Sequence, residues 1–146
     1  MAHTYYWGDI HLQNFGEKRG SQISPVKDAI DYGMKYTFHQ DTPVIPPDMM
    51  RTISSAVNRI SRGGRVIGEN QKISVLDALK AVTIYAAYQY FEEHEKGSIE
   101  CGKYADFVVL EKNPLKTPKE ELAEIKVWMT IKENEVIYRS GEANHE

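Results

Sequence analysis

The sequence predicts an α/β fold, and three observations support this prediction. Residues 35–41 alternate between apolar and polar side chains, which is the period of a β-strand. A proline-rich loop and a capped amphipathic helix follow, so the order is strand, loop, helix. After Gly97 the helical period gives way to short β-branched and aromatic runs between turn residues. We therefore expect strand-loop-helix units followed by a smaller part built from strands.

The N-terminal region is expected to begin without a helix. Residues 1–23 lack helical periodicity and contain three glycines, which predicts a strand end that runs into a long loop. Ser24 and Pro25 suit the start of a helix, and Gly33 suits its end. The strand at 35–41 follows.

Helices are expected in the middle of the chain. Three prolines in the segment 42–47 remove amide donors and fix the backbone, so a stiff loop is expected there. Asp48 can cap the next helix, whose apolar residues recur every three or four positions up to a glycine pair. Ser74 can open a further helix, and Thr83 can restart it as a second one.

The C-terminal region is predicted to consist mainly of strands. Residues 107–110 form an apolar run bounded by turn residues, and residues 117–120 suit a helix of one or two turns. The segments 126–132 and 136–139 are joined across a polar turn, which predicts a β-hairpin. The tail from Gly141 is expected to be frayed.

Composition places the chain among soluble globular proteins. Hydrophobic residues make up 41%, charged residues make up 27%, and the formal net charge is -3, so neither disorder nor nucleic-acid binding is expected. No apolar run could span a bilayer, and the first residues lack a secretion signal. Cys101 is the only cysteine, which excludes an internal disulfide and a cysteine zinc cluster. We expect a cytoplasmic location, with no nucleic acid and no membrane as partners.

Two candidate functional side chains stand at the end of the predicted strand at 35–41. His39 and Asp41 lie on the same face of it, where an imidazole and a carboxylate can bind metal or exchange protons. An aspartate before a proline loop is more often a turn or helix cap than a catalytic group, and a histidine is as often structural as functional. His11 and Asp9 fall in the expected N-terminal loop and are weaker candidates.

Several motifs, taken in order, resemble the C-terminal part of the amidohydrolase superfamily. They are Phe38-His39-Gln40-Asp41-Thr42-Pro43-Val44, Pro46-Pro47-Asp48, Leu76-Asp77-Ala78-Leu79, Gly97-Ser98-Ile99 and Gly102-Lys103-Tyr104-Ala105-Asp106-Phe107. Within that superfamily the sequence resembles the group of N-substituted formamide deformylases, and His3 to Asp9 resembles the end of that group's seventh barrel strand. The resemblance runs over nearly the whole chain.

The resemblance implies the C-terminal fragment of a TIM-type (β/α)8 barrel, about its last two strands with their helices, plus part of a small β-sandwich. Residues 1–92 would be the partial barrel, and residues 93–146 would be the C-terminal part of a composite β-domain. Such a barrel needs about 250 residues, so the chain is expected to be the last part of an enzyme. The terminal strands of this family pair with strands from the beginning of the polypeptide, so the expected partner is the missing N-terminal polypeptide or a second copy.

The resemblance also implies a metal-dependent hydrolase that acts on non-peptide carbon–nitrogen bonds in small amide- or formamide-type substrates. Asp41 matches the acid that binds the metal and shuttles the proton, and His39 and His3 are the expected substrate contacts. The expected cofactor of the complete enzyme is a divalent ion, namely zinc. A zinc site takes at least three protein ligands, so this chain alone is expected to bind metal weakly or not at all and to be inactive.

Three functional hypotheses remain open. The chain is part of a hydrolase that the missing barrel completes, a non-catalytic accessory or binding subunit that retains this part of the fold, or a small autonomous enzyme that uses His3, His39 and Asp41. Substrate identity is not predicted, because specificity in this fold depends on loops after other strands.

Overall fold

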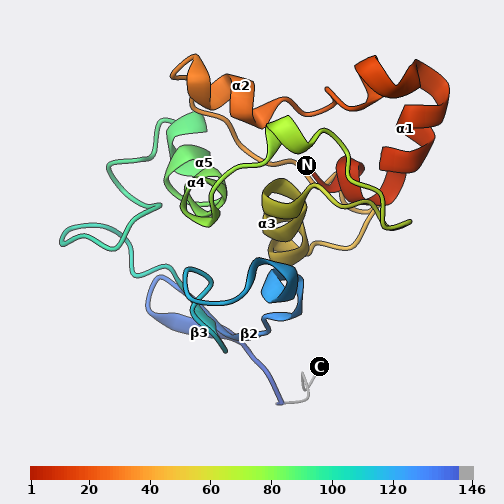
Figure 1. Cartoon of the computed structure of the whole chain (residues 1–146). Helices are drawn as coiled ribbons and strands as arrows, with labels where there is room; N and C mark the ends of the chain where they lie inside the picture. The colour runs from red at the N-terminus through yellow and green to blue at the C-terminus, as the bar shows by residue number, and fades with distance from the viewer. Residues whose placement is uncertain (142–146) are drawn as a thin grey trace.

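The computed structural model describes residues 1–141, and within them helices precede a small sheet (Figure 1). This confirms a mixed fold of helices and strands. The prediction for the tail beyond Gly141 concerns residues outside this range. In order, the elements are α1 (Ala2–Gly20), α2 (Val26–Asp31), α3 (Met49–Asn58), η1 (Glu69–Gln71), α4 (Val75–Ala81), α5 (Ile84–Gln89), β1 (Phe107–Leu110), η2 (Lys119–Glu124), β2 (Val127–Lys132) and β3 (Glu135–Arg139).

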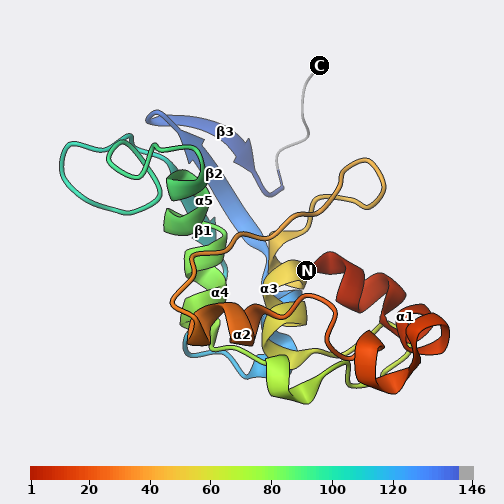
Figure 2. The same ribbon diagram turned by 90° about the horizontal axis from the view of Figure 1, so that it is seen from above.

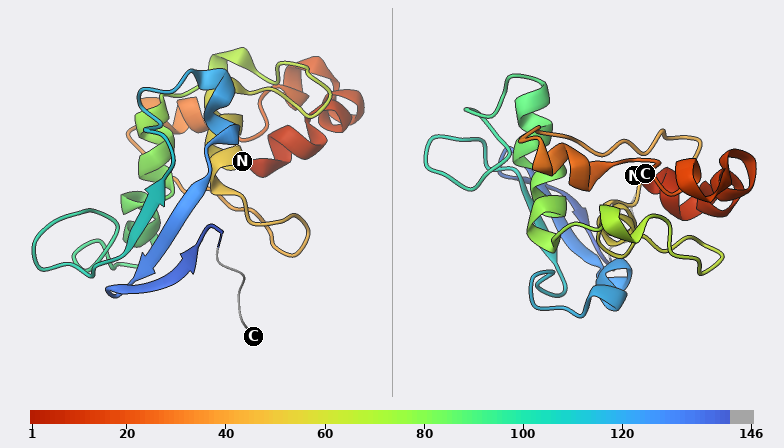
Figure 3. Two further views of the ribbon diagram at one scale, coloured as in Figure 1. Left: turned by 90° about the horizontal axis from the view of Figure 1, so that it is seen from below. Right: turned by 45° about the horizontal axis from the view of Figure 1, so that its top comes forward.

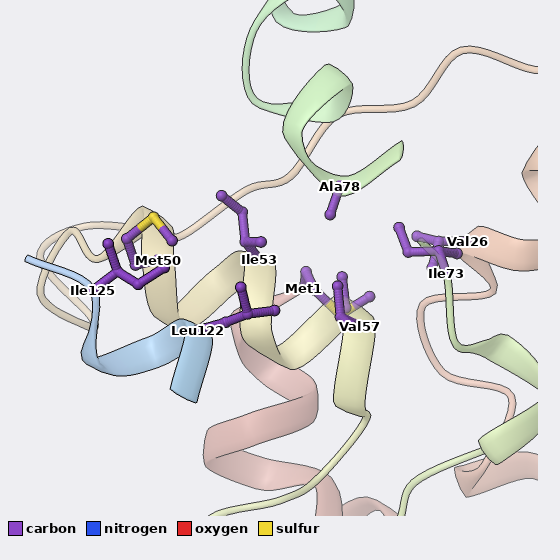
Figure 4. Close-up of a cluster of buried hydrophobic side chains, with 10 residues drawn as sticks. Met1, Val26, Met50, Ile53, Val57, Ile73, Ala78, Leu122 and Ile125 are labelled. Carbon is purple, nitrogen blue, oxygen red and sulfur yellow. The ribbon is translucent and has the colours of Figure 1, made fainter. Parts of the chain in front are cut away.

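Helix α3 lies at the centre of the hydrophobic core, as its amphipathic sequence predicts. Ile53, Ala56 and Val57 on its buried face are each 2% exposed or less. The 3₁₀ helix η2 packs on one side of α3 and α4 on another. Burying one aliphatic side chain of this size contributes about 1.5–3 kcal/mol. The remaining buried members of the cluster are Met1, Val26, Met50, Ile73, Ala78, Leu122 and Ile125 (Figure 4).

The predicted helix caps at Asp48 and Ser74 are confirmed. The Asp48 carboxylate accepts a hydrogen bond of 2.8 Å from the backbone N–H of Arg51, and the Ser74 hydroxyl accepts one of 3.1 Å from the N–H of Asp77. Each cap satisfies an N–H that has no partner inside the helix, which contributes about 1 kcal/mol. These caps explain why α3 and α4 begin where the sequence indicated.

The predicted hairpin is confirmed and forms part of a three-stranded antiparallel sheet of order β1-β2-β3 (Figure 3). Glu133 and Asn134 connect β2 to β3 with positive φ angles of 50° and 70°, as a two-residue hairpin turn of type I′ requires. In residues 1–141 no further strand pairs with the outer edge of β1 or of β3. Both edges therefore present backbone groups that another strand could pair with.

The prediction for residues 1–23 is wrong, because most of this segment, Ala2–Gly20, forms helix α1. Of the five residues that α1 buries, Thr4, Gly8 and Leu12 recur every four positions, but two of these three are polar or lack a side chain. Helix α1 therefore packs against the rest of the chain through small and polar residues that allow close approach, and not through a hydrophobic stripe. Gly8 shows this, since a Cβ there would lie only 2.7 Å from Ile67 Cγ1. A positive φ of 75° at Gly16 breaks α1 with a kink.

The predicted strand at 35–41 is also wrong, because this segment is extended without belonging to a sheet. A strand needs a neighbouring strand to pair its backbone groups, and the described residues place none beside it. The two parallel barrel strands expected from the resemblance are therefore not formed within residues 1–141. The helix predicted from Ser24 and Pro25, the stiff loop and the helix after Thr83 are present as expected.

None of the helices in the described range combines the length and the apolar composition needed to cross a membrane.

Gly68 is the glycine at which an added Cβ would meet a neighbouring atom most closely, and we expect the Gly68→Ala variant to be destabilised. Its φ is +67°, and a Cβ would lie 1.9 Å from the Ser21 carbonyl oxygen. Gly64 is the matched control, because its φ is +84° but no heavy atom lies within 4 Å of its would-be Cβ. Gly68→Ala should lower the free energy of unfolding by about 2 kcal/mol more than Gly64→Ala. Urea unfolding followed by circular dichroism measures both, and equal losses would contradict the packing.

Candidate functional site

Asp41 stands where the extended segment 35–41 meets the proline loop. Its φ of 67° lies in the left-handed region, which aspartate adopts more readily than most residues. Its carbonyl accepts a hydrogen bond of 2.8 Å from the N–H of Val44, which closes a turn containing the cis Thr42–Pro43 bond. The side chain is exposed, and within residues 1–141 its carboxylate forms no hydrogen bond or ion pair. It is therefore available to an ion or a substrate.

We group Asp41, His39 and His3 as one neighbourhood, because the charges of Asp41 and His39 both act on the pKa of His3. His3 lies in the first turn of α1, partly buried, with its ring centroid 5.1 Å from that of Trp7. Burial lowers the pKa of His3, the negative charge of Asp41 raises it, and a positive charge on His39 lowers it further. Charges act on one another in this way only at short range. Figure 2 shows the start of α1 beside α3, with the loop 42–47 protruding nearby.

His11 joins this neighbourhood, although its sequence context predicts only a weak candidate. It lies two turns after His3 on α1, stacks on Phe15 with ring centroids 6.0 Å apart, and its charge lowers the pKa of His3. Its Nδ1 atom is buried and has no hydrogen-bond partner among the described residues. The spacing of His3, Trp7, His11 and Phe15 at every fourth position was a helical signal. It was missed because residues 1–23 were interpreted as a loop.

The donor chemistry of this neighbourhood fits a divalent metal in part. Imidazole and carboxylate are ligands that zinc accepts, and Asp41 offers an uncommitted carboxylate. However, no group of three His, Cys, Asp or Glu side chains in residues 1–141 is arranged to hold a metal ion.

A cavity of about 460 Å³ lies in another part of the molecule. Its walls come from α5, the turn after Lys96 and strand β1, and they are mostly apolar, with Val82, Ala87 and Phe107 among them. Neither Asp41 nor His39 nor His3 lines it. Of these three residues, His39 and Asp41 are exposed and His3 is partly buried.

The titration of His3 gives a test of this arrangement that needs no activity. We expect Asp41→Asn to lower the pKa of His3 further, because it removes the negative charge that favours the protonated ring. Nuclear magnetic resonance titration of the His3 Cε1 proton measures this. Asp31→Asn, which changes an exposed acid on α2, is the control and should leave the pKa unchanged. An unchanged His3 pKa in Asp41→Asn would contradict the proximity of the two side chains.

The same shift predicts a direction for stability. Folding lowers the pKa of His3 below its ordinary value of about 6.5, so the unfolded chain binds the proton more tightly. The contribution of His3 to stability is therefore fully present above about pH 6.5, and it is lost as the pH falls through the folded-state pKa.

Comparison with known proteins identifies the family. The model of the amidohydrolase family matches residues 1–138. N-substituted formamide deformylase from Arthrobacter pascens is 27% identical over 140 residues, which cover 94% of this chain and 26% of that protein. The putative amidohydrolase YtcJ from Bacillus subtilis is 27% identical over 133 residues, which cover 89% of this chain and 25% of that protein. The chain thus spans about a quarter of the length of these curated relatives.

Other similarities are partial. Protein LONG AFTER FAR-RED 3 from Arabidopsis thaliana is 40% identical over 74 residues, which cover 50% of this chain and 13% of that protein. Among solved structures, an amidohydrolase from Thermotoga maritima MSB8 superposes with a TM-score of 0.59 at 22% identity, covering 78% of this chain and 25% of that one. This likeness supports the fold alone. The family match extends over nearly the whole chain and agrees with the order of motifs, and on that basis the chain belongs to the amidohydrolase family.

Proposed function

We propose that the chain forms the C-terminal part of a metal-dependent hydrolase that acts on non-peptide carbon–nitrogen bonds of the amide or formamide type. The observation that carries this proposal is the exposed, uncommitted carboxylate of Asp41, whose charge acts on the pKa of His3, in a chain of the amidohydrolase family. The name of the Arthrobacter pascens relative, an N-substituted formamide deformylase, supports the substrate class. In the complete enzyme, Asp41 acts as a ligand of a divalent metal, which we propose is zinc.

The proposed mechanism assigns a role to each of the three side chains. A bound divalent ion would polarise the substrate carbonyl and lower the pKa of a water molecule towards neutrality. The Asp41 carboxylate accepts the proton of the attacking water and returns it to the leaving nitrogen. His3, whose pKa is lowered by burial, is neutral at pH 7 and can accept or donate a hydrogen bond. His3 and His39 therefore orient the substrate.

We propose that the remaining barrel polypeptide completes both the site and the sheet. A zinc site takes at least three protein ligands, and residues 1–141 do not assemble them. The outer edge of β1 has no partner strand in the described range, and apolar side chains stand exposed around the 460 Å³ cavity, with Ile99 84% and Val108 54% exposed. A strand and helix from elsewhere in the enzyme would cover these surfaces. Without them, copies of the chain self-associate.

A second candidate is a non-catalytic accessory subunit that retains this part of the amidohydrolase fold. The observation that favours it is the lack of a three-ligand group among residues 1–141. In this case Asp41 would be dispensable for any activity that co-purifies with the chain. The two candidates therefore differ in whether activity requires Asp41.

The test uses the chain, tagged and recovered with its bound polypeptides from the cells that produce it. N-substituted formamides and other small amides are supplied, and release of the amine is measured before and after treatment with a chelator. We expect hydrolysis that falls at least about tenfold on chelation and returns when zinc is added. Hydrolysis that is insensitive to the chelator, or complexes without hydrolytic activity, would contradict the proposal.

A further inference from the structure

We propose that Gln40 is a positioning residue for Asp41, because its buried amide ties the backbone that carries the carboxylate to the first turn of α3. This inference rests on the proposed function of Asp41.

Gln40 is buried between two exposed neighbours. It is 7% exposed, whereas His39 and Asp41 on either side are exposed. The backbone at this point therefore presents His39 and Asp41 to solvent and directs Gln40 into the protein. The residue between the two candidate functional groups therefore serves as an anchor.

Both ends of the Gln40 amide are used. Its Oε1 accepts a hydrogen bond of 2.6 Å from the backbone N–H of Asp48, and its Nε2 donates one of 2.8 Å to the Thr52 hydroxyl. That hydroxyl is buried and in turn donates a hydrogen bond of 3.0 Å to the Asp48 carbonyl. The network joins Gln40 to the N-cap and first turn of α3, the helix at the centre of the core.

The hydrogen bond between Gln40 and Asp48 closes the loop 41–47 at its base. Asp41 is the first residue of this loop, and its φ of 67° is one that side-chain-bearing residues adopt only when the surroundings hold it. The residue before Asp41 is held by the side-chain amide of Gln40, and the carbonyl of Asp41 itself is held by the turn hydrogen bond from the Val44 N–H. Together they fix the direction in which the carboxylate leaves the backbone.

The chemistry of the network requires an amide at position 40. Glutamate would keep the acceptor for the Asp48 N–H but would present a second oxygen to Thr52, whose hydroxyl proton already serves the Asp48 carbonyl. Methionine has a similar length but neither acceptor nor donor of comparable strength. A graded series is therefore available, in which glutamate retains one hydrogen bond and methionine retains none.

The first experiment measures amide hydrogen exchange in the chain itself. In Gln40→Met, exchange of the backbone amides of Val44 and Asp48 should accelerate by about tenfold or more. In Gln40→Glu, the Asp48 amide should stay protected, and the protection of the Val44 amide should fall by less than in Gln40→Met. Gln13→Met, which alters an exposed glutamine on α1, is the control and should leave both amides unchanged. Unchanged protection at Val44 in Gln40→Met would overturn the inference. If Gln40→Met does not fold, Gln40→Glu carries the test alone, and undiminished protection at Val44 would overturn it.

The second experiment separates positioning from stability in the assembled enzyme. Gln40→Met should lower kcat by about tenfold to a hundredfold with little change in KM, because a misplaced carboxylate affects the proton transfer more than substrate binding. A purely structural role would lower the unfolding temperature and leave kcat per folded enzyme unchanged, which would overturn the inference. Full activity in Asp41→Asn would instead defeat the proposed function. The two failures are therefore distinguishable.

Discussion

Replacement of Asp41 by asparagine should lower kcat/KM of the assembled hydrolase by about a thousandfold. General acid–base catalysis by one side chain contributes about 10²- to 10⁴-fold, and the amide of asparagine neither accepts the proton nor carries the charge of a metal ligand. The exposed carboxylate has no other partner in residues 1–141. The variant should therefore fold normally and fail in catalysis. Steady-state amine release from the chain recovered with its bound polypeptides measures the effect.

Asparagine is the appropriate substitution because it preserves the backbone. It adopts the left-handed region readily, so the φ of 67° at position 41 is retained, and it has nearly the size of aspartate. Asp31→Asn on α2 changes an exposed acid by the same chemistry and should keep full activity. Activity of Asp41→Asn within about threefold of the unaltered enzyme would exclude Asp41 from the proton transfer.

Replacement of Arg59 by alanine should lower the free energy of unfolding by about 4 kcal/mol. Arg59 is 0% exposed, and its guanidinium donates hydrogen bonds to the carbonyls of Ile67 at 2.7 Å, Ile23 at 2.8 Å, Ser24 at 3.1 Å and Ser21 at 3.4 Å. Removing the donor leaves the carbonyls of Ile67, Ile23 and Ser21 without this partner, whereas the Ser24 carbonyl keeps a hydrogen bond from the Val26 N–H. Each buried unsatisfied group costs about 1–3 kcal/mol. Loss of side-chain packing adds to this.

The charge of Arg59 is balanced in an unusual way. Its guanidinium forms no ion pair with a carboxylate among the described residues, and burial lowers its pKa to about 10, so it stays charged at neutral pH. Carbonyl dipoles from the α1–α2 connection and from Ile67 take the place of a counter-ion. Arg59 thereby joins the end of α3 to the segment after α1. Its loss should loosen α1, which carries His3.

Three variants separate the causes. Arg62→Ala removes an exposed arginine and should change stability by less than about 0.5 kcal/mol. Arg59→Gly relieves the left-handed φ of 57° at this position, so it should recover about 1 kcal/mol relative to Arg59→Ala and remain strongly destabilised. Arg59→Lys keeps the charge without the planar fork and should be intermediate. An Arg59→Ala variant as stable as Arg62→Ala in urea unfolding would contradict the role of these hydrogen bonds.

The parts of the fold that sequence predicted well depend on local interactions. The caps at Asp48 and Ser74 are satisfied within three residues of each helix start. The hairpin follows from alternation and a two-residue turn, and neighbouring strands of this kind pair without help from distant segments. Local side-chain chemistry was sufficient for these elements.

The errors arose where structure depends on distant contacts. Alternation at 35–41 indicates a strand, but a strand forms only where another strand lies beside it. Residues 1–23 form a helix whose buried stripe includes Gly8, placed there by the approach of Ile67. Neither neighbour could be identified from the local pattern. Because the strand is not formed, the strand-end geometry expected for His39 and Asp41 is not formed either.

The candidate site divides in the same way. Asp41, His39 and His3 were identified through their motifs, and the charges of Asp41 and His39 both act on the pKa of His3. The supporting residues were not found, because Gln40 and Arg59 act through hydrogen bonds to residues between 8 and 38 positions away. A buried polar side chain acquires its role from tertiary structure. His11 could have been predicted from the sequence, since a helix over these residues places His11 on the same face as His3.

The central claim is that this chain contributes one part of a metal site that other polypeptide completes. Its most direct test is the metal content of the purified chain, measured together with its mass in solution. The claim predicts less than stoichiometric zinc and a mass above the 16.7 kDa of a single copy, because the ligand set is incomplete and the edge of β1 is uncovered. A monomer that holds one tightly bound zinc ion would contradict it.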